Sequence, residues 1–290
     1  MEEIGIRDMK KVIDTLYKSQ SVNFNDYAFS SFKRRIIRFL DLNKIRDLNE
    51  FTELIRTDNA FAENLVKEIT VNVTEMFRDP NFWIAIRDSV LPKINGNSPL
   101  NIWHAACSSG EEVYSMAILL HEAGLLKSSR IVATDLNKSV LNIAEKGIYS
   151  YKSQETNQRN YLEFGGKGNL SDWYIVNGNA VQYDRKLINN VEFRCHNLAG
   201  GEMKDNFDLI LCRNVLIYFN SDLQEKVIQN FSRNMSEGSF LGIGSKESIV
   251  WCKASKLFEE ESPIDKIYRR INEKERLNYT NLQESTHCKL

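Results

Sequence analysis

Acidic side chains follow two apolar stretches of this sequence, where a folded chain could present them to a ligand. The stretch LNIWHAA leads into the small-residue turn CSSG and then directly into Glu111 and Glu112. The stretch SRIVATD ends at Asp135, 25 residues after Gly110. Small residues let a ligand approach the backbone closely, and an acid about 20 residues beyond such a turn is typical of a ribose-binding position.

The charges around this turn indicate which kind of ligand suits it. The turn lacks the lysine of a phosphate-binding loop, and its acids would repel a pyrophosphate. A ligand with ribose hydroxyls and net positive character is therefore favoured over NAD or ATP. S-adenosylmethionine (SAM), which has a sulfonium and an α-amino group, meets both conditions.

Each of these acids also has a structural interpretation. Ser108 and Ser109 lie three residues before Glu111 and Glu112, so either pair fits a capping box at a helix start. Asp135 equally fits a cap of the helix that follows it. Capping accounts well for one acid at the turn and less naturally for two in a row.

A second group of candidates surrounds the sheet that these stretches predict. In FDLILCRNVLIYF (207–219), a buried strand runs into Arg213 and is followed by Tyr218, which places polar groups at the ligand edge of a parallel sheet. The alternatives are a structural ion pair for Arg213 and a core position for Tyr218. Three further polar residues precede the first strand in VNVTEMFRDPNFW, namely Asn72, Thr74 and Arg78.

The elements that must position these residues alternate between strands and helices from about residue 98 onward. Strands are expected at LNIWHAA, SRIVATD, VEFRCHNL, FDLILCRNVLIYF, SFLGIGS and IDKIYRRI, with helices at EEVYSMAILLHEAG, KSVLNIAEKGIY and NSDLQEKVIQNFSRNM. This alternation favours an α/β fold with a mostly parallel, doubly wound sheet. Short strands around glycine turns at about 150–190 predict a small β-rich insertion.

The N-terminal region, residues 1–85, is expected to be helical. In FSSFKRRIIRFLDL (29–42), an apolar stripe at helical spacing consists of Phe32, Ile36, Phe39 and Leu40. The rest of that helix surface is basic and carries Lys33, Arg34, Arg35 and Arg38. This basic surface fits either a solvated face or a docking surface for an acidic helical partner. Residues 272–290 are polar and aperiodic, which predicts a disordered tail.

The composition excludes several classes of protein. The formal net charge of −1 argues against a globally basic nucleic-acid binder. No apolar run approaches the roughly 18 residues that span a bilayer, and the N-terminus lacks the core of a signal peptide. The 5 cysteines are scattered without metal-ligand spacing, so we expect reduced thiols, no bound metal and a cytoplasmic location.

Four blocks of the sequence together resemble the chemoreceptor glutamate methyltransferases, the CheR family. NVTEMFRD resembles the family's N-x-T-x-F-F-R motif, and AACSSGEEVYS resembles A-A-C-S-T-G-E-E-P-Y-S. ATDLNKSVLNIAEKGIY and FDLILCRNVLIYF are similar to its second-strand and fourth-strand blocks, and the order and spacing match over roughly residues 20–271. Departures are Met76 for the first phenylalanine, Val113 for a proline, and GSKES (244–248) for G-H-S-E.

The resemblance implies a fold and an activity. The fold is a Rossmann-like class I methyltransferase domain over residues 86–271, with a small β-subdomain insertion, after an all-α N-terminal domain over 1–85. The activity is methyl transfer from SAM to glutamate carboxylates on the cytoplasmic helices of a chemoreceptor, in chemotaxis signal transduction, with S-adenosylhomocysteine as product. The basic helix would then dock onto acidic receptor helices.

The resemblance also implies roles for individual residues. Arg78 and Tyr218 match the residues proposed to orient the substrate carboxylate. The positions that match cofactor contacts are Asn72, Thr74, Arg78, Ala106, Glu112, Asp135 at the ribose, Asn197 and Leu198 beside the adenine, and Cys212 and Arg213 near the methionine moiety. In this assignment Glu112 faces the ligand and Glu111 is the cap.

A carboxylate nucleophile places few demands on the protein's acid–base chemistry. Its ordinary pKa of about 4.3 leaves it ionised at neutral pH, so no general base is expected and His104 is interpreted as structural. Arg78 is expected to engage one carboxylate oxygen while the other faces the methyl group. Two alternatives stay open: a small-molecule methyltransferase, against which the basic helical domain argues, and a non-catalytic cofactor-sensing module, against which Arg78, Arg213 and Tyr218 argue.

Overall fold

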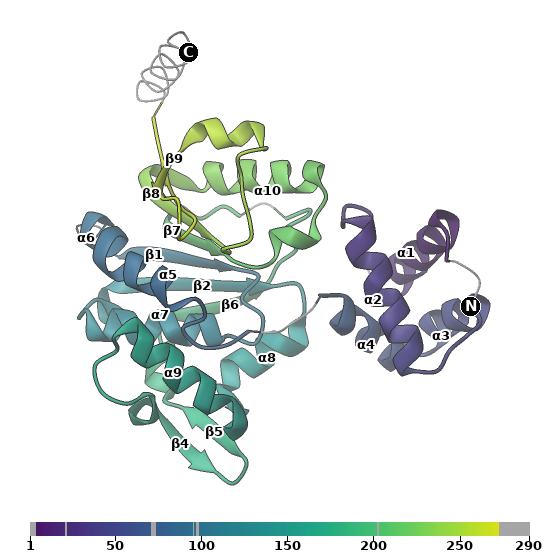
Figure 1. Cartoon of the computed structure of the whole chain (residues 1–290), viewed down its shortest axis with the longest axis horizontal. Coiled ribbons are helices and arrows are strands. Elements are labelled where there is room, and N and C mark those ends of the chain that lie inside the picture. The colour runs from purple at the N-terminus through teal and green to yellow at the C-terminus, as the bar shows by residue number, and fades with distance from the viewer. Residues whose placement is uncertain are drawn as a thin grey trace. The chain divides into compact units, whose positions relative to one another are not determined.

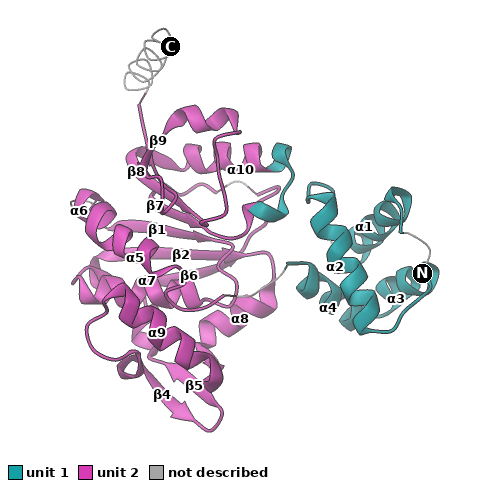
Figure 2. Ribbon diagram, viewed as in Figure 1, with its two compact units in different colours: residues 1–72, 217–223 teal, residues 73–216, 224–290 magenta. Residues whose placement is uncertain are grey.

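The computed structural model describes residues 4–20, 22–70, 74–94, 96, 99–201 and 203–272. The chain divides into two compact units, 1–72 with 217–223 and 73–216 with 224–290 (Figure 2). The predicted tail therefore lies outside the described residues, apart from its first residue. The helical unit ends at residue 72 instead of 85, because Phe82 and Trp83 are buried in the core of the second unit.

Four α-helices make up most of the described part of the first unit, and the all-α prediction for the N-terminal region is confirmed. They are α1 (Ile6–Gln20), α2 (Phe29–Leu42), α3 (Leu48–Thr57) and α4 (Asn59–Thr70). The buried side chains of α2 are Phe32, Ile36, Phe39 and Leu40, the stripe that the spacing predicts. Burying an apolar side chain of this size contributes about 1.5–3 kcal/mol, so the stripe decides which face of α2 points inward.

The segment 217–223 belongs to this first unit although it lies far along the chain. The N–H of Ala28 donates to the carbonyl of Tyr218 at 2.8 Å, and the N–H of Asn220 donates to the carbonyl of Asp26 at 2.9 Å. The rings of Tyr27 and Phe219 meet edge to face, with centroids 5.5 Å apart. The chain thus leaves the second unit after Leu216 and returns to it at Gln224.

The second unit is built on a seven-stranded sheet in the order β6-β2-β1-β7-β8-β10-β9 (Figure 1). The strands are β1 (Leu100–Ala105), β2 (Ser129–Asp135), β6 (Val191–Cys195), β7 (Phe207–Cys212), β8 (Met235–Ile243), β9 (Phe258–Ser262) and β10 (Ile267–Arg270). The first five pair in parallel, and β10 pairs antiparallel with β8 and β9. The predicted α/β fold with a mostly parallel sheet is confirmed, whereas β9 was not predicted because its FEEES sequence has one apolar residue.

Helices connect these strands and position the residues that follow the strand ends. They are α5 (Pro80–Ala85), the π-helix η1 (Ile86–Val90), α6 (Leu91–Ile94), α7 (Glu111–Glu122), α8 (Lys138–Lys146) and α10 (Ser221–Arg233). Short 3₁₀ turns are η2 (Leu126–Ser128), η3 (Tyr151–Ser153), η4 (Leu170–Trp173), η5 (Arg185–Ile188), η6 (Leu216–Tyr218) and η7 (Lys253–Leu257). No helix among the described residues is both long and apolar enough to pass through a membrane.

The irregular region near 150–190 contains a second sheet and a helix. Three antiparallel strands lie in the order β3-β5-β4, namely β3 (Ile148–Ser150), β4 (Tyr174–Asn177) and β5 (Ala180–Tyr183). The helix α9 (Gln154–Phe164), which was not predicted, packs against α5 (Figure 1). Its inward face includes the polar residues Asn157 and Asn160, so the apolar periodicity that would reveal a helix is weak.

Candidate functional site

The turn between β1 and α7 is held in an unusual backbone conformation. Ala106, Ser108 and Gly110 have φ angles of 64°, 53° and 94°. A Cβ atom at Gly110 would lie 2.6 Å from the Cβ of Ala144, so only glycine fits there. Gly110 occupies the N-cap position of α7, and neither predicted capping box forms. The prediction that Glu111 is the cap is therefore wrong.

Glu111 instead sits in the first turn of α7 without a cationic partner among the described residues. Its Oε2 accepts a hydrogen bond from the Ser109 hydroxyl at 2.7 Å. Burial raises the pKa of Glu111 to about 7, against the opposing effect of that hydrogen bond. The carboxyl group of Glu111 therefore titrates near neutral pH.

Asp135 joins the end of β2 to the same turn. Its Oδ2 accepts the N–H of Ser108 at 2.9 Å, and its Oδ1 accepts the N–H of Asn137 at 2.9 Å. Burial raises the pKa of Asp135 even though these backbone donors favour its ionised form. The cap of α8 is Asn137, whose side-chain oxygen accepts the N–H of Ser139 at 2.9 Å, so Asp135 is not that cap.

The predicted adenine residues follow β6, next to Asp135. The carbonyl of Asp135 accepts the N–H of His196 at 3.0 Å, which places Asn197 immediately beyond this contact. The Oδ1 of Asn197 accepts the N–H of Ala199 at 2.9 Å and closes a tight turn. Leu198 is half-buried in that turn. The ends of β2 and β6 therefore bring the predicted ribose and adenine positions together.

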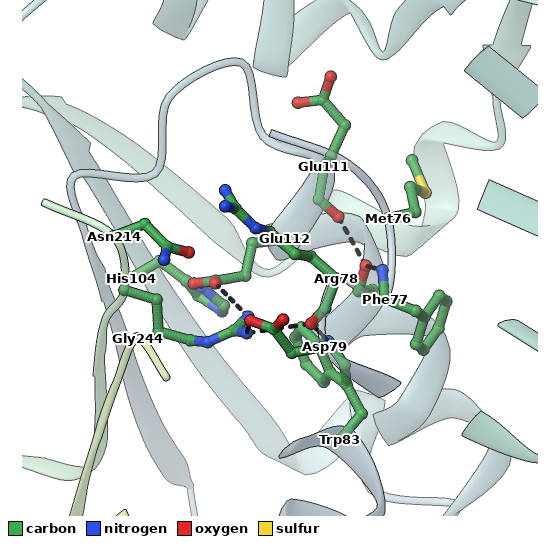
Figure 3. Close-up of polar contacts among 12 residues, drawn as sticks. Met76, Phe77, Arg78, Asp79, Trp83, His104, Glu111, Glu112, Asn214 and Gly244 are labelled. Atoms are coloured by element: carbon green, nitrogen blue, oxygen red, sulfur yellow. Dashed lines mark hydrogen bonds and ion pairs between the residues drawn. The ribbon is translucent and has the colours of Figure 1, made fainter. Parts of the chain in front are cut away.

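Arg213, directly after β7, is the centre of a charge cluster, and Figure 3 labels its partners Glu112, Asp79 and Arg78. Only 2% of its side-chain surface is exposed. Its Nη1 donates to Glu112 at 3.0 Å, and its Nη2 donates to Asp79 at 2.7 Å and to the Arg78 carbonyl at 3.0 Å. The guanidinium also lies over the ring of Phe82, 4.1 Å from its centroid. The structural ion pair, one of the alternatives for Arg213, is present.

Glu112 completes this cluster on its other side. Its Oε1 lies 2.9 Å from Nδ1 of His104, a residue of β1 whose side chain is fully buried. Burial would raise the pKa of Glu112, but His104 and Arg213 together hold the pKa below its ordinary value. Both carboxylate oxygens thus have protein partners, and contacts of Glu112 and Arg213 with the cofactor stay predictions.

Arg78 lies in a loop with two residues in the left-handed region, Phe77 at φ 50° and Asp79 at φ 57°. Such backbone strain persists only where the surroundings hold it. The carbonyl of Arg78 accepts the indole N–H of Trp83 at 3.1 Å in addition to Arg213. Its guanidinium, by contrast, makes no hydrogen bond or ion pair with any residue that the structure describes, and Figure 3 draws it without a contact.

The remaining predicted residues are distributed around this edge or lie outside it. Thr74 is half-buried before the Arg78 loop, and Asn72 lies outside the described residues. Cys212 is fully buried at the end of β7, and burial raises the pKa of its thiol, which keeps it protonated. Tyr218 belongs to the first unit, where its carbonyl contacts Ala28, so its predicted role stays a prediction.

Sequence reasoning missed one acid that shapes this edge of the sheet. Glu247, within the divergent GSKES segment, is 4% exposed and accepts the N–H groups of Gly244 at 2.6 Å and Asn214 at 2.9 Å. It ties the end of β7 to the end of β8 and supports Asn214, whose φ is 62°. The signal was present as an acid three residues after a glycine, but nothing local indicates its partner.

The acidic side chains at this edge of the sheet fit a cationic nucleoside. Glu111, Glu112 and Asp135 lie around the turn, while Glu112 and Asp79 together balance the charge of Arg213. Three left-handed residues in five also leave the turn's backbone free of large side chains. These are the features expected of a site for the ribose and sulfonium of SAM.

Comparisons with known proteins agree with this chemistry. Residues 72–267 match the family model described as CheR methyltransferase, SAM binding domain, and residues 7–70 match CheR methyltransferase, all-alpha domain. The chain is 38% identical to Cher3 of Pseudomonas putida over 264 residues, which are 91% of this chain and 96% of that protein. It is 32% identical to a chemotaxis protein methyltransferase of Listeria monocytogenes, and the match covers 77% of this chain and 83% of that protein.

A chemotaxis protein methyltransferase of Borreliella burgdorferi is 30% identical, and the match covers 83% of this chain and 88% of that protein. The chain belongs to the CheR methyltransferase family, and its cofactor is SAM.

Proposed function

We propose that this chain methylates glutamate side-chain carboxylates on the cytoplasmic helices of a chemoreceptor. Two of its relatives are named chemotaxis protein methyltransferases. The observation that carries the proposal is the contrast between Arg78 and Arg213, which are far apart in sequence but in contact in the structure. Arg213 is saturated by protein partners, whereas the Arg78 guanidinium has none among the described residues. The Arg78 guanidinium is therefore available to bind an anionic substrate.

The backbone around Arg78 is anchored on both sides, which defines where its side chain starts. The N–H of Phe77 donates to the hydroxyl of Ser115 at 2.8 Å, and Trp83 and Arg213 hold the Arg78 carbonyl. Arginine binds carboxylates through paired N–H donors. We infer that Arg78 engages one substrate oxygen and leaves the other facing the methyl group, because a full bidentate contact would weaken the nucleophile.

The chemistry then needs orientation more than proton transfer. SAM supplies, when bound, a methyl group made electrophilic by its sulfonium. A glutamate side chain with a pKa of about 4.3 is already ionised at neutral pH, so no general base is required. In the proposal Arg78 orients the carboxylate, a role that the family resemblance also implies for Tyr218, and alignment of this kind contributes up to about 7–11 kcal/mol.

Cofactor contacts in the proposal follow the family resemblance and the geometry of the turn. Asp135 would hold the ribose hydroxyls, and Asn197 and Leu198 would lie beside the adenine. Ala106 and Glu112 would contact the cofactor at the turn. The remaining proposed contacts come from Asn72, Thr74, Arg78, Cys212 and Arg213.

Receptor docking is assigned to the basic face of α2 within the first unit. Arg34 and Arg38 are exposed there, while Lys33 and Arg35 are half-buried. Arg38 also pairs with Glu68 of α4 at 3.0 Å. A basic face on a helix complements acidic receptor helices and mainly affects the rate and selectivity of encounter.

The proposal is tested by incubating the purified protein with tritiated SAM and membranes of the source cell. Base-labile label on a large membrane protein is the expected result. Label confined to small molecules would support a small-molecule methyltransferase instead. SAM binding without any transfer would indicate a cofactor-sensing module.

Arg78→Ala is the sharpest variant for this assay. We expect the transfer rate to fall by about 100-fold, because the carboxylate loses its orienting cation, with SAM still bound by calorimetry. The matched control is Arg233→Ala at the exposed end of α10, which should leave the rate unchanged. Full activity in Arg78→Ala would remove the proposed role.

A further inference from the structure

We propose that helix α9 of the insertion is a positioning element for the loop that carries Arg78. Its residues Asn157 and Asn160 hold the backbone of Met76 from both sides and thereby fix the direction in which Arg78 leaves the loop. The inference rests on the proposed function of Arg78, and its test distinguishes failure of one from failure of the other.

The contact is a clamp on one residue's backbone. Oδ1 of Asn157 accepts the N–H of Met76 at 3.1 Å, and Nδ2 of Asn160 donates to the carbonyl of Met76 at 3.0 Å. The two asparagines are 1% and 6% exposed. They lie three residues apart on α9 and so share one helix face. Loss of either asparagine amide would leave a buried backbone group of Met76 without its hydrogen-bond partner, which is unfavourable.

The same face of α9 also packs on the next residue of the loop. The ring of Phe77 stacks on Phe164 with centroids 4.9 Å apart and an interplanar angle of 19°. Tyr161 contacts Phe77 from the side, with centroids 5.2 Å apart. All four residues of this face lie at helical spacing, and together they fix the two residues that precede Arg78.

This support matters because the loop is strained. Phe77 and Asp79 adopt the left-handed region without being glycine, which is energetically unfavourable unless the surroundings hold it. A loop released from α9 would relax and move the origin of the Arg78 side chain. A displacement of about 1 Å from productive geometry can lower a rate by about 100-fold. The clamp therefore acts on catalysis through Arg78 without touching substrate.

Hydrogen bonds extend from the clamp into the small sheet. The Tyr183 hydroxyl, on β5, donates to Oε1 of Gln154 at 2.8 Å, and that oxygen lies 3.5 Å from Nδ2 of Asn157. Nε2 of Gln154 donates to the carbonyl of Ser150 at 3.1 Å. Gln154 is 4% exposed, and its contacts with Tyr183 and Asn157 are buried. The insertion and the Arg78 loop are thus one connected structure.

A matched pair of substitutions isolates the polarity of the clamp. Asn157→Asp keeps an oxygen that can accept the Met76 N–H, whereas Asn160→Asp puts an oxygen against the Met76 carbonyl. Both variants add the same acid to the same buried helix face. At pH 8.5 and saturating SAM, we expect Asn160→Asp to lower methyl transfer to source-cell membranes by about 30-fold or more, and Asn157→Asp by about three-fold at most.

The pH profile and SAM binding provide readouts that a general loss of structure would not share. In Asn160→Asp, the introduced carboxyl group can donate to the Met76 carbonyl once it is protonated. The rate of this variant relative to wild type should therefore rise between pH 8.5 and 6. Calorimetric affinity for SAM should stay within about three-fold of wild type in both variants. Arg159→Ala, on the exposed face of α9, should match wild type throughout.

A double-mutant cycle separates this inference from the proposed function. In an Arg78→Ala background, Asn160→Asp should cause little further loss, because the clamp acts through Arg78. Equal losses in the two asparagine variants, or fully additive losses with Arg78→Ala, would overturn the clamp while leaving the role of Arg78 intact. If Arg78→Ala retains full activity, the proposed role of Arg78 fails, and the clamp that acts through it fails as well. If Asn160→Asp does not fold, Tyr183→Phe tests the same chain of contacts, and Asn157→Asp is compared with Asn157→Leu. The clamp would be overturned if Tyr183→Phe left the transfer rate unchanged and the two Asn157 variants lowered it equally.

Discussion

Arg213 at the end of β7 and Arg38 on α2 are both ion-paired, but the two ion pairs differ in how far they are exposed to solvent. Arg213 has 2% of its side-chain surface exposed and pairs with Glu112, which has 16%. Arg38 has 60% exposed and pairs with Glu68, which has 24%. Breaking a buried pair typically costs about 3–5 kcal/mol, and an exposed pair contributes about 0–1 kcal/mol. Arg213 joins three segments of the chain because it pairs with Asp79 as well as Glu112, whereas the Arg38 pair leaves its cation exposed.

The largest effect is expected from Arg213→Met, which leaves Glu112 buried without its cation. We expect the free energy of unfolding to fall by about 3–5 kcal/mol, measured by urea denaturation of the second unit's transition. The free energy of unfolding of Arg213→Lys should lie between those of Arg213→Met and wild type. Lysine keeps the charge but lacks the planar group that bonds Glu112 and Asp79 at once. A loss below about 1 kcal/mol would show that the buried cluster behaves like the surface pair.

The next largest effect is expected at the exposed basic face of α2. Arg34→Glu should raise the apparent KM for receptor membranes by about ten-fold and leave the affinity for SAM unchanged, because it reverses charge on the proposed docking face. Lys18→Glu makes the same change on the exposed surface of α1 and serves as the control. Equal effects of the two variants would indicate only a general electrostatic attraction, which high salt would also remove.

Glu111 sharpens the comparison because it is a half-buried acid without the cation that Glu112 has. Its pKa of about 7 in the folded state lies above its ordinary value of 4.5. The folded state therefore binds the proton more tightly, and stability is lost as pH rises from about 4.5 to about 7. Glu111→Gln should match wild type in melting temperature at pH 4.5 and exceed it at pH 8 in the ligand-free protein. A constant difference across this range would exclude the shifted pKa.

The smallest effect is expected from Arg38→Ala. Because its ion pair is exposed, the free energy of unfolding should change by less than about 1 kcal/mol in a urea titration. Glu68→Ala should give a similar small value, and the double variant should reveal little coupling. A coupling above about 2 kcal/mol would mean that α2 and α4 depend on this pair for their packing.

Much of the fold was predictable because its signals are local. The apolar stripe of α2 appears at helical spacing and is the stripe that the structure buries. The stretch SRIVATD has a central run of apolar and β-branched residues, IVAT (131–134), and it forms β2 with the predicted bounds. The strand β9 and helix α9 were missed for the converse reason, since charged or polar residues occupy positions where periodicity would have shown.

The candidate site was predictable only in its residue types. Adjacent acids after a small-residue turn indicated a cationic nucleoside, and the family comparison agrees on SAM. The partners of those acids were beyond the sequence. Glu112 meets Arg213 across 101 residues, and Asn157 meets Met76 across 81, and no local pattern encodes contacts at such separations.

The sequence by itself determined the strand and helix order, the charge of the turn and the basic face of α2, because each depends on neighbouring residues. The tertiary structure decided which of two arginines is saturated by protein partners and which is open. It also decided that two asparagines of an inserted helix hold the loop before Arg78. The physical reason is that hydrogen bonds and buried charges need a partner at about 3 Å, and packing brings that partner from distant parts of the chain.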